Sequence, residues 1–264
     1  MKLSVYSQIA PALKTLRLPA IQQQYRQVAD LARRESWSYE QFLLDLVSRE
    51  NESRDQKKIA RMLKASRLPL QKNLTQFDRH RLPMKINAQL SALLEGSFLE
   101  RAENVLAFGN PGSGKTHLLC ALAQELVRQG RPILFRPCSL LVQELLVAKK
   151  DLKLARMLKQ LSRYDALLID DIGYVQYDRE EMEVLFTLLA DRYEKRSIML
   201  TCNLPFSKWE LIFKDPMTTA AAIDRLVHHS IIIEINLPSY RLESSQKRYQ
   251  EQPLKPEQIE GSKG

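Results

Sequence analysis

The chain has 264 residues, of which 44% are hydrophobic and 27% are charged, and it carries a formal net charge of +9. This length supports one sizeable core with a small second unit, and the composition is that of an ordinary globular protein. No stretch is apolar over the ~20 residues that a transmembrane helix needs, and the first residues lack the apolar run of a signal peptide. We therefore expect no membrane partner.

The cysteine pattern indicates the redox environment. Cys120, Cys138 and Cys202 are odd in number, far apart and outside any C-x-x-C spacing. This pattern argues against a disulfide framework or a zinc site, and it favours a reducing cytoplasm as the location.

The positive charge is unevenly distributed. Residues 1–85 carry 17 Lys and Arg against 8 Asp and Glu, whereas residues 86–264 carry 23 of each. Such a basic segment predicts an acidic partner, most simply nucleic acid. The alternative is a basic face that is merely solvated.

Residues 1–67 are predicted to form a small all-α domain. Helical spacing within residues 1–35 indicates two helices separated at Leu18-Pro19, and Ser38 with Gln41 forms a capping-box pattern for a third. The apolar positions of the following segment, which we expect to lie in the core, are Phe42, Leu43, Leu46, Val47, Ile59, Met62 and Leu63.

Residues 68–100 are predicted to be a connector. Leu68-Pro69 breaks the preceding helix, and a second Leu-Pro follows at 82–83. Helical spacing resumes over residues 84–94.

From residue 101 to 249, strand and helix patterns alternate. This alternation predicts an α/β domain, with a parallel sheet covered by helices on both faces. The expected strands are 105–108, 132–135, 166–169, 197–202 and 231–235. The remaining residues 250–264 are rich in Pro, Glu, Lys and Gly and are expected to form a flexible tail.

Residues 109–116 match the phosphate-binding loop G-x-x-x-x-G-K-[ST] of nucleoside triphosphatases. The loop lies between an expected strand and an expected helix, so its backbone N–H groups and the helix N-terminus can surround an anion. Lys115 would reach the β and γ phosphates of ATP, and the Thr116 hydroxyl would ligate Mg²⁺. The nucleotide-binding residues are therefore Gly109, Asn110, Pro111, Gly112, Ser113, Gly114, Lys115, Thr116 and the adjoining His117.

Two acidic residues end the expected strand at 166–169. Ligands bind at the carboxyl edge of such sheets, where Asp170 and Asp171 would lie beside the phosphate loop. Asp170 would hold Mg²⁺ directly or through water, and Asp171 would orient or deprotonate the attacking water.

Two further polar residues are candidates for catalysis. Asn203 follows the strand at 197–202, where a neutral amide could position water; the alternative is an ordinary Asn-containing turn. Arg225 follows a helical Ala-rich run and suits an arginine finger, unless it forms only a surface salt bridge.

Residues 140–163 form a long helical pattern with six Lys and Arg against two acids. Its basic residues, among them Lys149, Lys150 and Lys153, could contact a phosphate backbone. A solvated helix face is the alternative interpretation.

Taken together, these motifs resemble the IstB-like AAA+ ATPases, the helper proteins of certain bacterial insertion sequences, over nearly the whole chain. The most specific likeness is the C-terminal string with Asn203-Leu204-Pro205, Asp224-Arg225-Leu226 and Ser239-Tyr240-Arg241. The resemblance implies an AAA+ core, a sensor role for Asn203, an arginine-finger role for Arg225 and DNA contacts by helices within 139–163. Asp171 departs from the Glu usual in AAA+ proteins.

The resemblance implies an ATP- and Mg²⁺-dependent ATPase that binds duplex DNA, assembles into a ring or helical homo-oligomer and assists an IstA-like transposase. A DnaC-like helicase loader shares the same core and remains the nearest alternative. A small-molecule kinase and a nucleotide-gated adaptor without appreciable turnover are more distant ones.

Overall fold

The computed structural model describes residues 5–173 and 178–240. The chain divides into two compact units, residues 1–64 and 65–264. This division lies three residues before the boundary expected at residue 67, and the tail expected at 250–264 falls outside the described residues. Within the described parts, no helix has the length and apolarity needed to cross a membrane.

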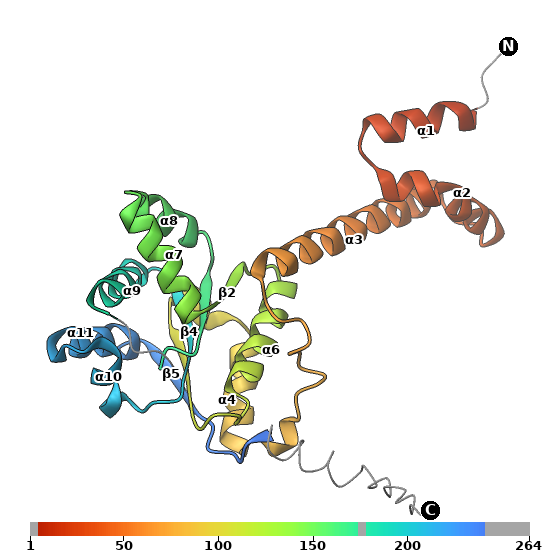
Figure 1. Ribbon diagram of the computed structural model, residues 1–264. Coiled ribbons are helices and arrows are strands. Elements are labelled where there is room, and N and C mark those ends of the chain that lie inside the picture. Colours follow the sequence, from red (N-terminus) through yellow and green to blue (C-terminus); the bar gives the residue numbers. More distant parts are fainter. Residues whose placement is uncertain (1–4, 174–177, 241–264) are drawn as a thin grey trace, which may run out of the picture. The chain divides into compact units, whose positions relative to one another are not determined.

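The first unit contains three helices, α1 (Val5–Thr15), α2 (Pro19–Arg34) and α3 (Tyr39–Ser66) (Figure 1). The predicted capping box starts α3, because Gln41 N donates to Ser38 Oγ at 3.2 Å and Ser38 N donates to Gln41 Oε1 at 2.8 Å. The buried apolar side chains are Ile21, Tyr25, Val28 and Leu46.

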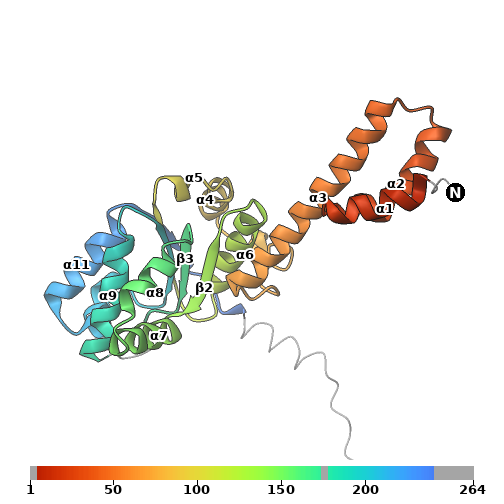
Figure 2. The same ribbon diagram turned by 90° about the horizontal axis from the view of Figure 1, so that it is seen from above.

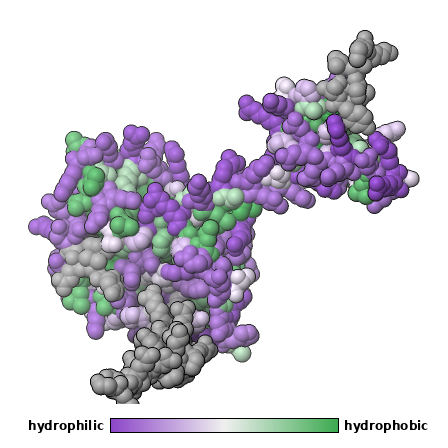
Figure 3. Space-filling model, turned by 45° about the vertical axis from the view of Figure 1, so that its right-hand side comes forward, coloured by the Kyte–Doolittle hydropathy of each residue, from purple (hydrophilic) through white to green (hydrophobic). Residues whose placement is uncertain are grey.

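The core of this unit is narrower than the sequence predicts. Leu43 and Val47 were expected to be core residues, but their side chains are 60% and 42% exposed. α3 contributes only one stripe to the cluster, through Leu46 and the partly buried Phe42, because two short helices cover only part of its surface. In the view of Figure 3, the visible surface of this unit is largely hydrophilic, with scattered apolar side chains.

The second unit is built on a parallel five-stranded sheet. Its strands are β1 (Asn104–Phe108), β2 (Ile133–Pro137), β3 (Ala166–Asp170), β4 (Ser197–Cys202) and β5 (Ser230–Glu234). They run in the order β2-β3-β4-β1-β5, in which β4 is the central strand and pairs with β1. The predicted α/β fold with a parallel sheet is confirmed.

Helices cover both faces of the sheet (Figures 1 and 2). One face packs against α6 (Lys115–Arg128) and α4 (Met84–Leu94), and the other lies under α7 (Cys138–Lys150), α9 (Arg179–Arg192) and α11 (Pro216–Val227). All five residues of β1 are buried, because the strand lies in the middle of two covered faces. The shorter elements are η1 (Arg79–Arg81), α5 (Ser97–Glu100), α8 (Leu154–Leu161), η2 (Phe206–Lys208) and α10 (Glu210–Phe213).

The helical pattern predicted over residues 140–163 is interrupted. α7 ends at Lys150 and α8 starts at Leu154. Leu152, between them, has a φ of 58° and is 95% exposed. A left-handed residue ends a helix, so the basic side chains of this region lie on two helices instead of one.

Candidate nucleotide-binding site

The phosphate loop connects β1 to α6, as the sequence predicts. Gly109, directly after β1, has a φ of 147°, and a Cβ there would lie 2.1 Å from the carbonyl oxygen of Ile235. Gly112 has a φ of 81°, and its Cβ would lie 2.1 Å from Ser239 Oγ. Both positions require glycine, because a side chain would collide with the segment that follows β5.

Lys115 opens α6 and is 6% exposed. Its Nζ donates to the carbonyl oxygens of Gly109 and Asn110 at 2.7 and 2.9 Å. The ammonium group is therefore held against the loop at the N-terminus of a helix, where backbone N–H groups favour an anion. This arrangement suits the binding of phosphate groups.

Asp170 links the phosphate loop to the sheet. Its Oδ1 accepts hydrogen bonds from Thr116 Oγ1 at 2.7 Å and from Thr201 Oγ1 at 2.6 Å. A carboxylate and a hydroxyl oxygen from opposite sides of the site are the hard ligands that Mg²⁺ prefers, so Thr116 and Asp170 fit the metal role expected of them.

Asp171 is exposed and follows β3 directly. Its main-chain N–H donates to Thr201 Oγ1 at 2.8 Å, and its φ is 67°. A left-handed backbone at a non-glycine residue costs free energy, and such residues cluster at functional sites. Thr201 thus positions both acidic residues, through the carboxylate of one and the amide of the other.

Asn203 follows β4, next to Asp170 and Asp171 along the sheet edge. Its Oδ1 is buried and has no hydrogen-bond partner among the described residues. A Cβ on Gly173 would lie 2.5 Å from this oxygen, so the amide faces the turn that follows the two aspartates. An unsatisfied buried acceptor is costly, so this oxygen is suited to accept a hydrogen bond from a ligand of the site.

Arg225 lies away from this group of residues. The side-chain amide of Asn104, the first residue of β1, donates to the main-chain oxygen of Arg225 at 3.5 Å, whereas the phosphate loop follows the last residue of the same strand. The Arg225 Nη1 donates to Ala221 O at 3.0 Å, and its Cζ lies 4.7 Å from the ring centroid of Phe186. Arg225 therefore does not join the nucleotide site of its own chain.

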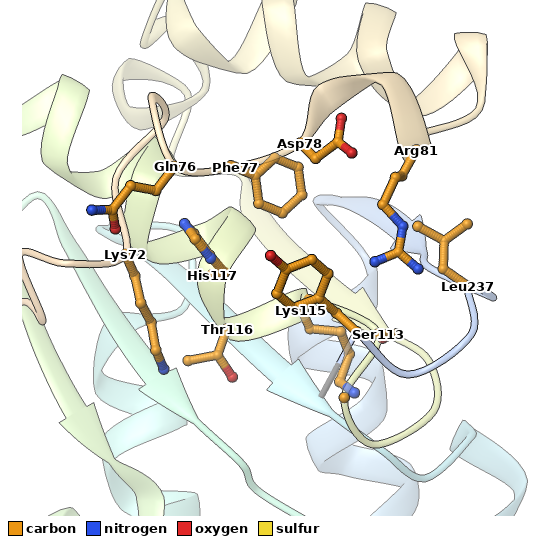
Figure 4. Close-up of a pocket in the computed structure, with 13 residues that line it drawn as sticks. Lys72, Gln76, Phe77, Asp78, Arg81, Ser113, Lys115, Thr116, His117 and Leu237 are labelled. Carbon is orange, nitrogen blue, oxygen red and sulfur yellow. The ribbon is translucent and has the colours of Figure 1, made fainter. Parts of the chain in front are cut away.

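A cavity of about 190 Å³ adjoins the phosphate loop (Figure 4). Besides loop residues and His117, it is lined by residues that the sequence assigned only to a connector or left without a role, namely Lys72, Gln76, Phe77, Asp78, Arg81, Leu237 and Tyr240. The spacing of these residues carries no chemical motif, and the signals for them were the resemblance of Ser239-Tyr240-Arg241 to the IstB-like pattern and a similar likeness at Lys72 and Phe77-Asp78.

Several contacts hold these residues in place. His117 Nε2 lies 2.9 Å from the main-chain oxygen of Asn73, and its ring packs edge-on against Phe77 with centroids 5.1 Å apart. Tyr240 N donates to Gly112 O at 3.0 Å, and the Arg81 guanidinium lies over the Tyr240 ring at 5.3 Å. The connector and the segment after β5 thus form the walls of a cavity whose floor is the phosphate loop.

Comparison with known proteins shows the family of this chain. A family model described as IstB-like ATP binding protein matches residues 11–248. The chain belongs to this family.

The similarity to relatives within the family covers most of this chain and most of each relative. An insertion-sequence ATP-binding protein of Sinorhizobium fredii is 42% identical over 244 residues, which cover 91% of this chain and 82% of that protein. The ATP-binding protein of insertion sequence IS21 from Pseudomonas aeruginosa is 38% identical and covers 89% of each chain.

Solved structures share the fold of this IstB-like protein. The DnaC helicase loader superposes with a TM-score of 0.54 at 17% identity, over 67% of this chain and 99% of that one. DnaA from Aquifex aeolicus, bound to AMPPCP, gives a TM-score of 0.52 at 19% identity, over 71% of this chain and 57% of that one. At these identities the likeness establishes the AAA+ type of fold.

The lysines expected to contact DNA differ in their surroundings. Lys149 Nζ forms an ion pair with Glu183 at 2.8 Å, and Lys153 Nζ pairs with Asp151 at 3.2 Å. Lys150 is exposed and forms no ion pair within the described residues. None of the three lines the nucleotide cavity. In this IstB-like chain, they form a separate surface on and after α7.

Two cysteines lie close to the nucleotide site. Burial raises the pKa of Cys120 to about 12 and that of Cys202 to about 11. Both thiols therefore stay protonated at neutral pH and are poor nucleophiles.

Proposed function

We propose that the chain hydrolyses ATP, binds duplex DNA and assists a transposase in target selection and transposition. The observation that carries the proposal is the double hydrogen bond to Asp170. Its carboxylate joins Thr116 of the phosphate loop to Thr201 of β4, with Asp171 as the next residue. Thr201 also accepts a hydrogen bond from the main-chain N–H of Asp171, so a second acidic residue is fixed next to the first, and a protein that only binds nucleotide does not need it.

Each residue of the site has a separable role in the proposed reaction. Lys115 and the loop N–H groups bind the β and γ phosphates. Thr116 and Asp170 would hold Mg²⁺, which neutralises charge that develops on the phosphate oxygens. Asp171 orients or deprotonates the attacking water, and Asn203 holds that water in line without competing for the metal.

Phosphate contacts by basic side chains would provide the proposed DNA binding. Residues 1–85 carry the whole excess of positive charge, and α7 and α8 add exposed lysines and arginines. DnaA, which shares the fold, has been solved with single-stranded DNA, which supports nucleic acid as the class of ligand. The curated relatives are named as insertion-sequence proteins, and this favours a transposase partner over the replicative helicase of a DnaC-like loader.

The nucleotide site is tested by two substitutions measured for both ATP binding and turnover. Lys115→Ala should weaken ATP binding about ten- to a hundredfold, because hydrogen bonds to charged groups contribute ~1.5–3 kcal/mol. Asp171→Asn should leave binding unchanged and slow turnover about a hundredfold, the range of a lost general base. Lys85→Ala on the exposed start of α4 is the matched control and should change neither quantity.

The partner is tested separately. Turnover is measured with duplex DNA, with single-stranded DNA and with the transposase encoded by the same insertion sequence. Stimulation by duplex DNA, together with binding to that transposase, is expected. Preference for single strands and for a replicative helicase would instead establish the loader function.

Equal turnover in Asp171→Asn and the parent protein would remove Asp171 from its proposed role.

A further inference from the structure

A second group of ligand-type side chains lies outside the nucleotide site. Glu194, His228 and His229 are all exposed, and they offer one ligand atom each within 4.8 Å of one another. The cysteine pattern argues against a zinc site, but it takes no account of histidines. The two histidines are adjacent in sequence, whereas Glu194 is brought to them by the fold.

The backbone of the cluster is anchored on both sides. His228 follows α11, and its N–H donates to Asp224 O at 3.0 Å, while the carbonyl oxygen of His229 accepts from Asn104 N at 2.7 Å. Glu194 occupies the turn between α9 and β4 with a φ of 57°. The three positions are therefore held by the sheet and its helices, and only the exposed side chains need to adjust.

The side chains are arranged loosely around a common point. His229 Nε2 lies 3.8 Å from Glu194 Oε1, which is too long for a hydrogen bond, and the two imidazole ring centroids are 4.2 Å apart. The Tyr193 hydroxyl lies 3.1 Å from His228 Nδ1. Its oxygen can accept a hydrogen bond from a protonated Nδ1, the outer contact that orients a metal-binding imidazole.

We propose that Glu194, His228 and His229 bind one divalent transition-metal ion, with Zn²⁺ as the best fit. Two imidazoles and one carboxylate with an open position are a ligand set of tetrahedral zinc. Zinc–ligand bonds of about 2.0–2.2 Å place ligand atoms about 3.3 Å apart, so rotation of exposed side chains suffices to close the cluster. Mg²⁺ and Ca²⁺ prefer oxygen ligands and are disfavoured here.

Few other groups of the chain compete for zinc. All four histidines and all three cysteines lie within the described residues. The cysteines are buried, and His80 and His117 lie elsewhere, in η1 and at the nucleotide cavity. Binding at the cluster is therefore measurable on the intact chain, and it does not depend on the proposed ATPase function.

The test uses untagged full-length protein, stripped with a chelator and kept free of nucleotide, with millimolar Mg²⁺ to occupy oxygen sites. Zn²⁺ is titrated against a chromogenic indicator of micromolar affinity. The parent protein should bind one equivalent, and His229→Asn and Glu194→Gln should each weaken binding at least about tenfold. His80→Asn, an exposed histidine in η1, is the matched control and should bind as the parent does.

A spectroscopic readout identifies the ligands. Co²⁺ in place of Zn²⁺ should give visible absorption bands of a four-coordinate site, and these bands should be absent from the His228→Asn/His229→Asn double variant. Circular dichroism checks that the variants, all at exposed positions, keep the parent fold. A parent protein that binds less than one equivalent at about 100 µM Zn²⁺, or a double variant that binds as tightly as the parent, overturns the proposal.

Discussion

At the scale of single residues, Asn203 presents a buried side-chain oxygen that no described group satisfies. Such an acceptor destabilises a fold by about 1–3 kcal/mol unless a ligand satisfies it, which the hydrolytic water of the proposed reaction would do. Gly173 permits this arrangement, since a side chain there would collide with the amide.

If Asn203 holds the water, its replacement should affect ATP turnover and protein stability differently. Asn203→Ala should slow ATP turnover about a hundredfold, the effect of a misplaced reactant, without weakening ATP binding. Its unfolding temperature should be equal to or above that of the parent, because the substitution removes an unsatisfied polar atom. Turnover, nucleotide affinity and thermal unfolding are compared with Asn51→Ala, an exposed control on α3. A loss of stability together with unchanged turnover would make Asn203 a structural residue.

At the scale of elements, the left-handed Leu152 divides the basic region into α7 and α8. α7 packs against α9, and this packing brings Lys149 to Glu183. The hydrogen bond from Lys149 and its charge lower the pKa of Glu183, so the acid stays ionised beside the lysine. A lysine in such a pair is less available to a phosphate group than its unpaired neighbour.

DNA binding should therefore depend on Lys150 more than on Lys149. Lys150→Ala should lower duplex affinity and reduce the slope of log K against log salt by about 0.9, the value for one phosphate contact. Lys149→Ala, its matched neighbour, should change the slope less. Both effects should be the same for unrelated duplex sequences, because phosphate contacts carry no base information. Equal salt slopes for Lys150→Ala and the parent would return α7 to the solvated-face interpretation.

In the first unit, α3 supplies the N-cap that α2 lacks. The carboxylate of Glu50 is 3% exposed and accepts hydrogen bonds from Ala20 N at 2.8 Å and Ile21 N at 3.2 Å. Burial raises the pKa of Glu50, but the hydrogen bonds from Arg54 and these two amides outweigh it, and the pKa lies below its ordinary value. The ionised carboxylate thus joins the N-terminus of α2 to the middle of α3.

Glu50→Gln should destabilise this helix pair by about 1–3 kcal/mol at neutral pH. Because the folded pKa is lowered, the contribution of Glu50 is fully present above its unfolded pKa and is lost as pH falls through the folded one. The difference between variant and parent should therefore shrink in acid. Hydrogen exchange of the α2 amides measures it, and Glu52→Gln, an exposed control on the same helix, should exchange as the parent does. A difference that persists in acid would mean that packing, and not the carboxylate, explains the effect.

At the scale of the whole molecule, the phosphate loop and Arg225 lie at opposite edges of the sheet. The loop follows Phe108 at the end of β1, while Arg225 contacts Asn104 at its start. One chain cannot bring the two together, but a second copy that presents its Arg225 edge to the loop of the first can. The proposed arginine finger therefore requires a homo-oligomer.

Mixing two inactive variants tests this arrangement. Arg225→Ala should bind ATP but turn over about 10³-fold more slowly, the lower range for a lost arginine finger. Lys115→Ala keeps its finger, and its nucleotide site stays largely empty at an ATP concentration below its weakened affinity. Each alone should be inactive, and the mixture should recover part of the DNA-stimulated rate, measured after co-assembly is shown by cross-linking. Co-assembly without recovery would count against Arg225 acting across a subunit boundary.

The nucleotide loop and the strands were predictable because their signals are local. Residues 109–116 carry a spacing that only a strand, a tight glycine turn and a helix satisfy, and all five strands lie within two residues of their predicted bounds. Asp170 and Asn203 were placed at one sheet edge by the rule that parallel strands end there together. The proximity of Asp170 to Thr116 followed from the topology alone.

Tertiary packing decided the rest, because contacts between distant segments leave no periodic trace in a sequence. The connector forms a wall of the nucleotide cavity, where the main-chain oxygen of Asn73 contacts the His117 ring. The packing of α7 on α9 places Lys149 in an ion pair with Glu183. Leu43 is exposed because α1 and α2 are too short to cover α3. Glu194 lies beside two histidines that are 34 and 35 residues away in the sequence, because the α9–β4 turn and the end of α11 reach the same edge of the sheet.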